Sequence, residues 1–210
     1  MQETPLSPAL PALPPLPARL ATFAGWGALV GIAFFSIYPT MNWLTGLRSG
    51  QHALYLEAEL ALPFVPQFIW LYLSMYLLFA VPPFFLNPPE LKRLARELIA
   101  GTLLSGLIFL LLPARLGFPR VVPDDPTLKS LYEGIFLLDQ PFNLVPSLHV
   151  VYSAAIVFAV MARAGLGHRL FFAGWLALIA VSTLLVHQHH LLDVAAGLAL
   201  ASLMRFSWKE

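Results

Sequence analysis

Long apolar runs, several of them long enough to cross a lipid bilayer, constrain this chain more than any other feature of its sequence. Six of them lie at approximately 20–39, 64–86, 97–113, 146–162, 169–186 and 190–206. A helix of roughly 20 apolar residues spans the hydrocarbon core of a membrane. Of the 210 residues, 59% are hydrophobic and only 11% are charged, whereas a soluble domain carries about 25% charged residues. The sequence therefore predicts an all-α, integral membrane protein with a bundle of six transmembrane helices.

The chain divides into two regions. Residues 1–19 carry proline at every third position from Pro5 to Pro17, which favours polyproline II over a helix. This tail lacks the basic start and the uninterrupted apolar core of a signal peptide, and we expect it to be disordered or to lie at the membrane interface. Residues 20–210 form the expected six-helix membrane domain. Only a few residues join its last two spans, so we expect these spans to form a tight antiparallel hairpin.

Two pairs of small residues lie within the spans. Gly27 and Gly31 in the first span, and Gly197 and Ala201 in the last, have the four-residue spacing that lets membrane helices approach closely. This spacing is common in membrane helices, so we interpret both pairs as packing positions.

The distribution of Lys and Arg predicts the orientation of the chain. With six spans, both termini share one side of the bilayer with the loops around residues 87–96 and 163–168. Eight basic residues fall on that side: Arg19, Lys92, Arg93, Arg96, Arg163, Arg169, Arg205 and Lys209. Four fall on the other side: Arg48, Arg115, Arg120 and Lys129. Because cytoplasmic loops are enriched in Lys and Arg, we expect both termini in the cytoplasm, and the 113–145 loop and the 187–190 turn on the extracytoplasmic face.

Charge and cysteine content limit the possible functions. A net charge of +1 without a basic stripe argues against a nucleic-acid partner. The chain has no cysteine, which excludes disulfides, thiolate nucleophiles and cysteine-based metal sites. Any catalysis must therefore come from His, Asp, Glu, Ser, Lys or Arg.

Four of the six histidines form two clusters, and both clusters are expected on the extracytoplasmic face. The first has the sequence Asn-Leu-Val-Pro-Ser-Leu-His, over residues 143–149. Pro146 and Ser147 are typical helix-start residues. A helix that begins there directs its unpaired N–H groups and the positive end of its dipole at an anion. His149 would lie in the first turn, close to a bound phosphate.

The second cluster has the sequence Ser-Thr-Leu-Leu-Val-His-Gln-His-His-Leu-Leu-Asp, over residues 182–193. His189 and Asp193 are four residues apart and lie on one face of a helix. A carboxylate that holds one ring nitrogen of a histidine fixes its tautomer and leaves the other nitrogen as a base or nucleophile. An Asp at membrane depth is costly, which makes Asp193 a functional candidate. The alternative is a structural pair at the membrane interface.

These two clusters resemble motifs of the type 2 phosphatidic acid phosphatase superfamily. The Pro-Ser-Leu-His at 146–149 looks like its second signature. Residues 182–193 look like its third, in which Ser and Arg precede His-x-x-x-Asp by five residues, and Ser182, His189 and Asp193 match that spacing. The interval between the motifs and the six-helix layout also match, so the resemblance covers about residues 20–206. It implies a phosphatidic acid phosphatase type 2-like fold and a lipid phosphate as substrate.

The sequence departs from the family pattern at the phosphate-binding cations. Thr183 occupies the place of the usual arginine in the third motif. The first motif, a lysine seven residues before Arg-Pro, is largely missing, because Ile108 stands at the lysine and Leu116 at the proline. Only Arg115 matches it. We therefore expect Arg115 to bind the phosphate, with Arg120 as the second candidate.

The missing arginine is similar to a subgroup of the family. Inositolphosphorylceramide synthases and sphingomyelin synthases carry a related His-x-x-x-Asp without it, and the doubled His189-His190 resembles theirs. These relatives transfer a phospho-headgroup between lipids instead of hydrolysing it. The resemblance thus implies either a lipid phosphatase or, as the alternative, a phospho-headgroup transferase.

The resemblance also implies a mechanism. His189 attacks phosphorus and forms a phosphohistidine, Asp193 orients His189, and His149 protonates the leaving lipid alkoxide. Four residues are expected to bind the phosphate oxygens: Arg115, Ser147, Ser182 and Arg120. Neither a metal nor another cofactor is required.

Other features leave alternatives open. His187 either touches the substrate or is an ordinary histidine of the headgroup region. The stretch from Glu57 to Pro66 either walls the headgroup pocket or forms an interfacial hairpin. The His-x-His-His sequence also resembles the histidine boxes of membrane metalloenzymes, which need several such boxes, whereas His52 and His168 are isolated. A catalytically inactive, lipid-binding relative is the remaining alternative.

Overall fold

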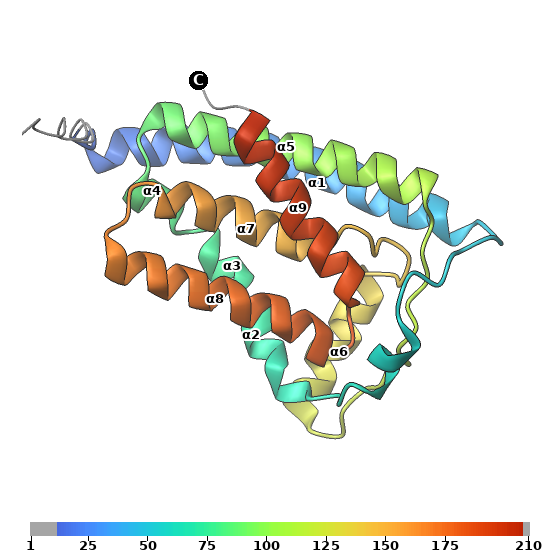
Figure 1. Cartoon of the computed structure of the whole chain (residues 1–210). Helices are drawn as coiled ribbons and strands as arrows, with labels where there is room; N and C mark the ends of the chain where they lie inside the picture. Colours follow the sequence, from blue (N-terminus) through green and yellow to red (C-terminus); the bar gives the residue numbers. More distant parts are fainter. Residues whose placement is uncertain (1–11, 208–210) are drawn as a thin grey trace, which may run out of the picture.

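The computed structural model describes residues 12–207, and within them the fold is all-helical, as predicted (Figure 1). Residues 1–11, which hold most of the Pro-rich tail, and 208–210, which include Lys209, lie outside the described residues. Three helices of the described part are long and apolar enough to cross a membrane: α1 (Leu16–Gly46), α5 (Pro88–Leu111) and α8 (Leu166–Leu185). These helices are compatible with a membrane protein.

The helix α1 begins at Leu16, within the region predicted to be a disordered tail. Pro17 is compatible with this start, because the first N–H groups of a helix have no intrahelical partner. With 31 residues, α1 is about 46 Å long. It packs along α5, where a Cβ atom added to Gly106 would lie 2.6 Å from the Cγ2 atom of Ile37.

The two small-residue pairs differ in what they contact. A Cβ atom added at Gly27 or Gly31 would have no atom within 4 Å, so the interpretation of this pair as a helix-packing position is wrong. Gly197 does face another helix, because an added Cβ would lie 2.9 Å from the carbonyl oxygen of Ser147. Close packing therefore explains the glycine of the last span and leaves those of the first unexplained.

The predicted second span, residues 64–86, is broken into short helices. They are η2 (Pro66–Phe68), α2 (Ile69–Leu73), α3 (Met75–Leu78) and α4 (Pro82–Phe85). The Ser74 hydroxyl donates to the carbonyl of Leu71 at 2.5 Å, and such local side-chain bonds compete with a regular helix. Pro82 and Pro83 supply no backbone N–H, so the segment restarts as α4.

The helix α7 (Leu148–Met161) is the centre of the bundle. Eleven of its 14 residues are buried, and it contacts α5, α8 and α9 (Leu191–Ser207). A helix that is apolar on all sides belongs in the interior. The helices α8 and α9 diverge from their connecting turn and each packs on α7 (Figure 1). The predicted tight hairpin of the last two spans is therefore wrong, because α8 and α9 pack on α7 and not along each other.

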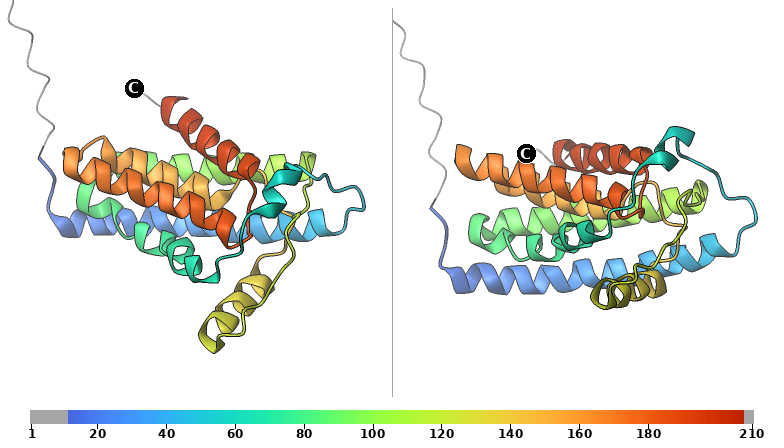
Figure 2. Two further views of the ribbon diagram at one scale, coloured as in Figure 1. Left: turned by 60° about the horizontal axis from the view of Figure 1, so that its bottom comes forward. Right: turned by 90° about the horizontal axis from the view of Figure 1, so that it is seen from below.

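Two further helices lie outside the predicted spans. The helix α6 (Pro126–Leu138) occupies part of the 113–145 segment, which was expected to be a loop, and it projects away from the bundle (Figure 2). The Asp125 side chain accepts hydrogen bonds from the N–H groups of Thr127 and Leu128, both at 3.0 Å. This is an ordinary N-cap followed by proline. The short helix η1 (Glu57–Ala61) follows α1.

Candidate active site

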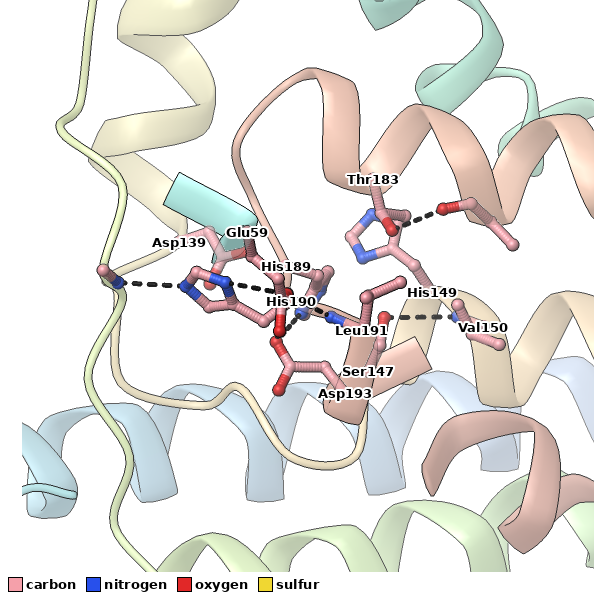
Figure 3. A network of polar contacts seen from close by, with 12 residues as sticks. Glu59, Asp139, Ser147, His149, Val150, Thr183, His189, His190, Leu191 and Asp193 are labelled. Atoms are coloured by element: carbon pink, nitrogen blue, oxygen red, sulfur yellow. Dashed lines mark hydrogen bonds and ion pairs between the residues drawn. The ribbon is translucent and has the colours of Figure 1, made fainter. Parts of the chain in front are cut away.

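The two histidine clusters meet at one end of the bundle, as their predicted co-location requires. His149 lies in the first turn of α7, and His189 lies in the turn between α8 and α9 (Figure 3). Their ring centroids are 5.9 Å apart. Both side chains line one cavity, so a single small group within it can contact both rings.

The His189 ring is held by Asp193, as its spacing predicted. The Nδ1 atom of His189 lies 3.2 Å from Oδ2 of Asp193, and both residues are buried. The same carboxylate oxygen accepts the backbone N–H of His190 at 2.8 Å. Because a carboxylate only accepts hydrogen bonds, Nδ1 of His189 carries the proton. The Nε2 atom is then left with a lone pair, as a base or nucleophile needs.

One backbone carbonyl at the end of α8 holds the turn that carries His189, by accepting two hydrogen bonds from it. The Thr183 carbonyl accepts the N–H groups of Gln188 and His189 at 3.0 and 3.1 Å. His187 adopts a left-handed conformation with φ of 56°, which reverses the chain toward α9. The Thr183 hydroxyl donates to the carbonyl of Ala180 at 2.8 Å. Its side chain is therefore used within α8 and supplies no positive charge to the site.

His149 is oriented by Tyr72, a residue that sequence reasoning missed. The two rings stack with centroids 4.2 Å apart, and the Tyr72 hydroxyl lies 3.4 Å from Nδ1 of His149. The Nε2 atom of His149 is buried and has no hydrogen-bond partner within residues 12–207. Buried polar atoms are normally paired, so this nitrogen is suited to a ligand in the cavity.

The two predicted phosphate-binding serines have other partners. Ser147 is the N-cap of α7, where its hydroxyl accepts the N–H of Val150 at 3.4 Å, so the predicted helix start is confirmed. The Ser182 hydroxyl donates to the carbonyl of Ile179 at 2.6 Å. Both serines are fully buried, and neither lines the cavity. Ser147 shapes the site by starting α7 there, and Ser182 is buried within α8.

The two predicted arginines lie in different environments, and neither lines the cavity. Arg115 has an exposed side chain. Arg120 donates to the backbone carbonyls of Phe136, at 3.1 Å, and Asp139. Its guanidinium also lies 4.7 Å from the ring centroid of Phe136. Burial lowers the pKa of Arg120, and the charge of Asp139 opposes this shift. Arg120 is thus the arginine held beside the site.

Asp139 is a second residue that sequence reasoning missed. It ends α6, lines the cavity together with both histidines, and accepts a hydrogen bond of 2.5 Å from the Tyr38 hydroxyl. Burial raises the pKa of Asp139, while the Tyr38 hydrogen bond and the charges of His189 and Arg120 lower it. Tyr38 comes from α1 and Asp139 from α6, so only the tertiary fold brings them to the site.

Both ring nitrogens of His190 are bonded to the protein (Figure 3). Its Nε2 accepts the backbone N–H of Gly117 at 3.0 Å, so Nδ1 carries the proton and donates to Oε2 of Glu59 at 3.3 Å. Glu59 also accepts the N–H of Leu191 at 2.7 Å. Burial lowers the pKa of His190. The stretch that contains Glu59 therefore anchors the histidine turn and does not line the cavity.

His187 is also occupied by the protein. Its Nε2 atom lies 3.1 Å from the carbonyl oxygen of Leu62, and its ring stacks on Phe118 with centroids 4.0 Å apart. Burial lowers the pKa of His187. These contacts favour an ordinary structural histidine over a substrate contact. His187 and His190 are both bonded to protein atoms. This argues against the histidine-box interpretation, in which they would be metal ligands.

The described residues thus define a class: an all-helical chain with three helices able to cross a membrane and a buried His–His–Asp site at one end. No family model, no curated protein and no solved structure matches this chain. The resemblance to the type 2 phosphatidic acid phosphatases therefore rests on the two sequence motifs.

Proposed function

We propose that this chain is an integral membrane lipid phosphatase that hydrolyses a phosphate ester through a phosphohistidine at His189. One observation supports the proposal above all others. Asp193 holds Nδ1 of His189 and leaves Nε2 available, and the unpaired Nε2 of His149 belongs to a ring 5.9 Å away on the same cavity. Phosphoryl transfer through histidine requires a nucleophile and a proton donor that both reach the same phosphate group.

The reaction proceeds in two displacements. The Nε2 atom of His189 attacks phosphorus, and an N–P bond forms as the P–O bond to the lipid breaks. Asp193 stabilises the positive charge that develops on the His189 ring. His149, whose imidazolium form is favoured by the phosphate dianion, gives its proton to the lipid alkoxide. A water molecule then attacks phosphorus, passes a proton to His149 and breaks the N–P bond.

The phosphate charge is compensated by the start of α7 and by Arg120. The first N–H groups of a helix have no intrahelical partners and carry partial positive charge. The helix α7 begins just after its N-cap at Ser147, and its first two residues, Leu148 and His149, line the cavity. Arg120 adds a full charge near Asp139. This arrangement replaces the family cations that are missing at Ile108 and Thr183.

The proposed topology has six crossings, with both termini in the cytoplasm and the active site on the extracytoplasmic face. The broken segment from η2 to α4 and the short α7 count as crossings. With 14 residues, α7 is about 21 Å long, and it is enclosed by α5, α8 and α9. A helix as short as α7 is tolerated at membrane depth where it is buried in protein.

A phospho-headgroup transferase is the second candidate, and the pair of Asp139 and Tyr38 favours it. Their hydrogen-bonded side chains line the same cavity as His189. A carboxylate in that place can orient the hydroxyl group of a second lipid or of inositol and accept its proton. In this version an alcohol, rather than water, resolves the phosphohistidine.

A substrate panel tests both versions. Purified protein is given phosphatidate and alkyl phosphates, with and without inositol or ceramide, while free phosphate and new phospholipid are measured. We expect an acid-labile, base-stable phosphoprotein in the native chain and none in His189→Ala. His168→Ala is the matched control, because His168 is exposed and does not line the cavity. Equal turnover by the native chain and His189→Ala would refute the proposal.

A further inference from the structure

An apolar cavity of about 770 Å³ extends from the candidate active site along α1. Its two histidines and its one carboxylate, His149, His189 and Asp139, lie at one end. Aromatic and aliphatic side chains line the rest, from Tyr38 near the site to Phe23. These two residues are 15 positions apart, which corresponds to about 22 Å of helix. The cavity is therefore amphipathic, with acid–base groups at one end and a long apolar remainder.

The glycines of α1 keep this cavity open. Gly27 and Gly31 line it, and a Cβ atom added to either would have no atom within 4 Å. A side chain at either position would project into empty space. Gly31 lies seven residues from Tyr38, or about 10 Å of helix, and Gly27 lies about one turn further. Gly27 and Gly31 therefore leave room in the cavity, which explains them where helix packing does not.

The cavity also opens sideways, between α1 and the neighbouring helices α3 and α6. Phe35, Tyr76 and Leu138 line it, yet they are 74%, 62% and 82% exposed. A wall residue that is also exposed on the outside marks an opening at that place. This opening is apolar, and exposed apolar surface of this kind marks a membrane or ligand contact.

We propose that this cavity holds one hydrocarbon chain of the lipid phosphate whose headgroup meets His189, and that Gly31 and Gly27 set the chain length that fits. This inference rests on the proposed function. The substrate enters from the bilayer between α1 and α3, with its phosphate at the histidines and its chain along α1. The volume lies within the range of about 300–1,000 Å³ that is typical of sites for one small molecule.

A chain-length series tests the inference. Octyl, dodecyl and hexadecyl phosphate are compared as substrates of the native chain, Gly31→Phe and Gly27→Phe. We expect the native chain to favour hexadecyl phosphate. In Gly31→Phe, kcat/KM for hexadecyl phosphate falls by roughly tenfold for every two methylene groups excluded, while octyl phosphate is turned over as before. Gly27→Phe, further from the site, shows the same loss only for the longest chain.

Gly25→Phe is the matched control. Gly25 lies on the same helix, is exposed, has no atom within 4 Å of an added Cβ and does not line the cavity. We expect it to keep the native chain-length preference. The inference is overturned if Gly31→Phe also keeps that preference, or if Gly25→Phe loses it to the same extent.

A binding experiment separates the chain site from the chemistry. The His189→Ala protein is photolysed with hexadecyl phosphate that carries a diazirine near the end of its chain, and labelled peptides are mapped. We expect labels on α1 between Phe23 and Val30 that unlabelled hexadecyl phosphate competes away and that Gly31→Phe abolishes. Labels elsewhere would overturn the chain site. If the native chain turns over no lipid phosphate but α1 is labelled as expected, the chain site is supported and only the phosphatase is refuted.

Discussion

The backbone N–H of Ser147 donates a hydrogen bond to the backbone carbonyl of Asp193, with an N···O distance of 3.0 Å. This bond joins the N-cap of α7 to the first turn of α9, so main-chain contacts hold the two motifs together. Gly197, one turn after Asp193, permits the approach, because an added Cβ would lie 2.9 Å from the carbonyl oxygen of Ser147. The distance between His149 and His189 therefore depends on a glycine that contacts neither.

Replacing Gly197 with valine tests this dependence. The clash involves a backbone oxygen that cannot rotate away, so α9 must shift relative to α7. We expect the free energy of unfolding to fall by about 1–3 kcal/mol and turnover of lipid phosphate to fall further, because the histidines separate. Thermal unfolding in detergent and turnover measure the two effects. Gly174→Val is the control, since Gly174 is exposed and an added Cβ has no atom within 4 Å. A native unfolding temperature and turnover for Gly197→Val would contradict this account.

Asp193→Asn tests the role of the carboxylate separately from the fold. An asparagine oxygen keeps the hydrogen bond from the N–H of His190, but its neutral side chain no longer stabilises a positive His189 ring. We expect kcat to fall by about a hundredfold or more, in line with the loss of the orienting carboxylate in other His–Asp pairs. Unfolding temperatures should change little. If turnover stays within a factor of about two, the carboxylate has no catalytic role.

Local spacing predicted the parts of the site that lie within one turn of helix. The four-residue interval between His189 and Asp193 predicted their contact of 3.2 Å. The predicted reason was only partly right, because His189 lies in the turn before α9 and only Asp193 lies on that helix. The helix start at Ser147 was likewise readable from Pro-Ser. Tyr38, Tyr72 and Asp139 reach the cavity from three different elements. No local pattern distinguishes them from other aromatic and acidic residues.

The sequence predicted the helices correctly where the apolar runs are continuous. The prediction failed where polar groups or prolines interrupt the runs. The all-helical class and the positions of α1, α5 and α8 follow from hydropathy. The segment 64–86 is interrupted at Ser74, whose hydroxyl donates to the carbonyl of Leu71, and again before Pro82. A hydropathy window registers neither interruption. The start of α6 was readable, because Asp125-Pro126 is an N-cap followed by proline. We did not predict α6, because the charged residues in and around it resemble those of a loop.

Arg120→Gln and Arg115→Gln test which arginine serves the phosphate. The side chain of Arg120 is held beside Asp139, whereas that of Arg115 is exposed. A charge-assisted hydrogen bond contributes about 1.5–3 kcal/mol, so we expect kcat/KM to fall by about ten- to a hundredfold for Arg120→Gln. Arg115→Gln should remain near the native value. Arg120→Lys, which keeps the charge, should recover part of the loss. A larger effect at Arg115 than at Arg120 would reverse this assignment.

Glu59→Gln tests the anchor behind the site through the pH dependence of stability. Burial raises the pKa of the Glu59 carboxyl, but hydrogen bonds from the N–H groups of Leu56 and Leu191, together with His190, outweigh burial and lower it below its ordinary value. A depressed folded pKa stabilises the folded state above the unfolded value of about 4.3. This contribution disappears as the pH falls through the folded pKa.

We therefore expect Glu59→Gln to unfold at a lower temperature than the native chain at pH about 7, with the difference shrinking toward pH about 3. Glu57→Gln is the control, because Glu57 is the exposed neighbour in the same short helix. Glu59 does not line the cavity, so turnover by Glu59→Gln, measured below its unfolding temperature, should stay close to native. A temperature difference that is the same at both pH values would show that the carboxylate charge does not anchor the turn. A large loss of turnover in a folded Glu59→Gln protein would instead place Glu59 in the chemistry, because an anchor alone alters stability and leaves the His189–Asp193 pair intact.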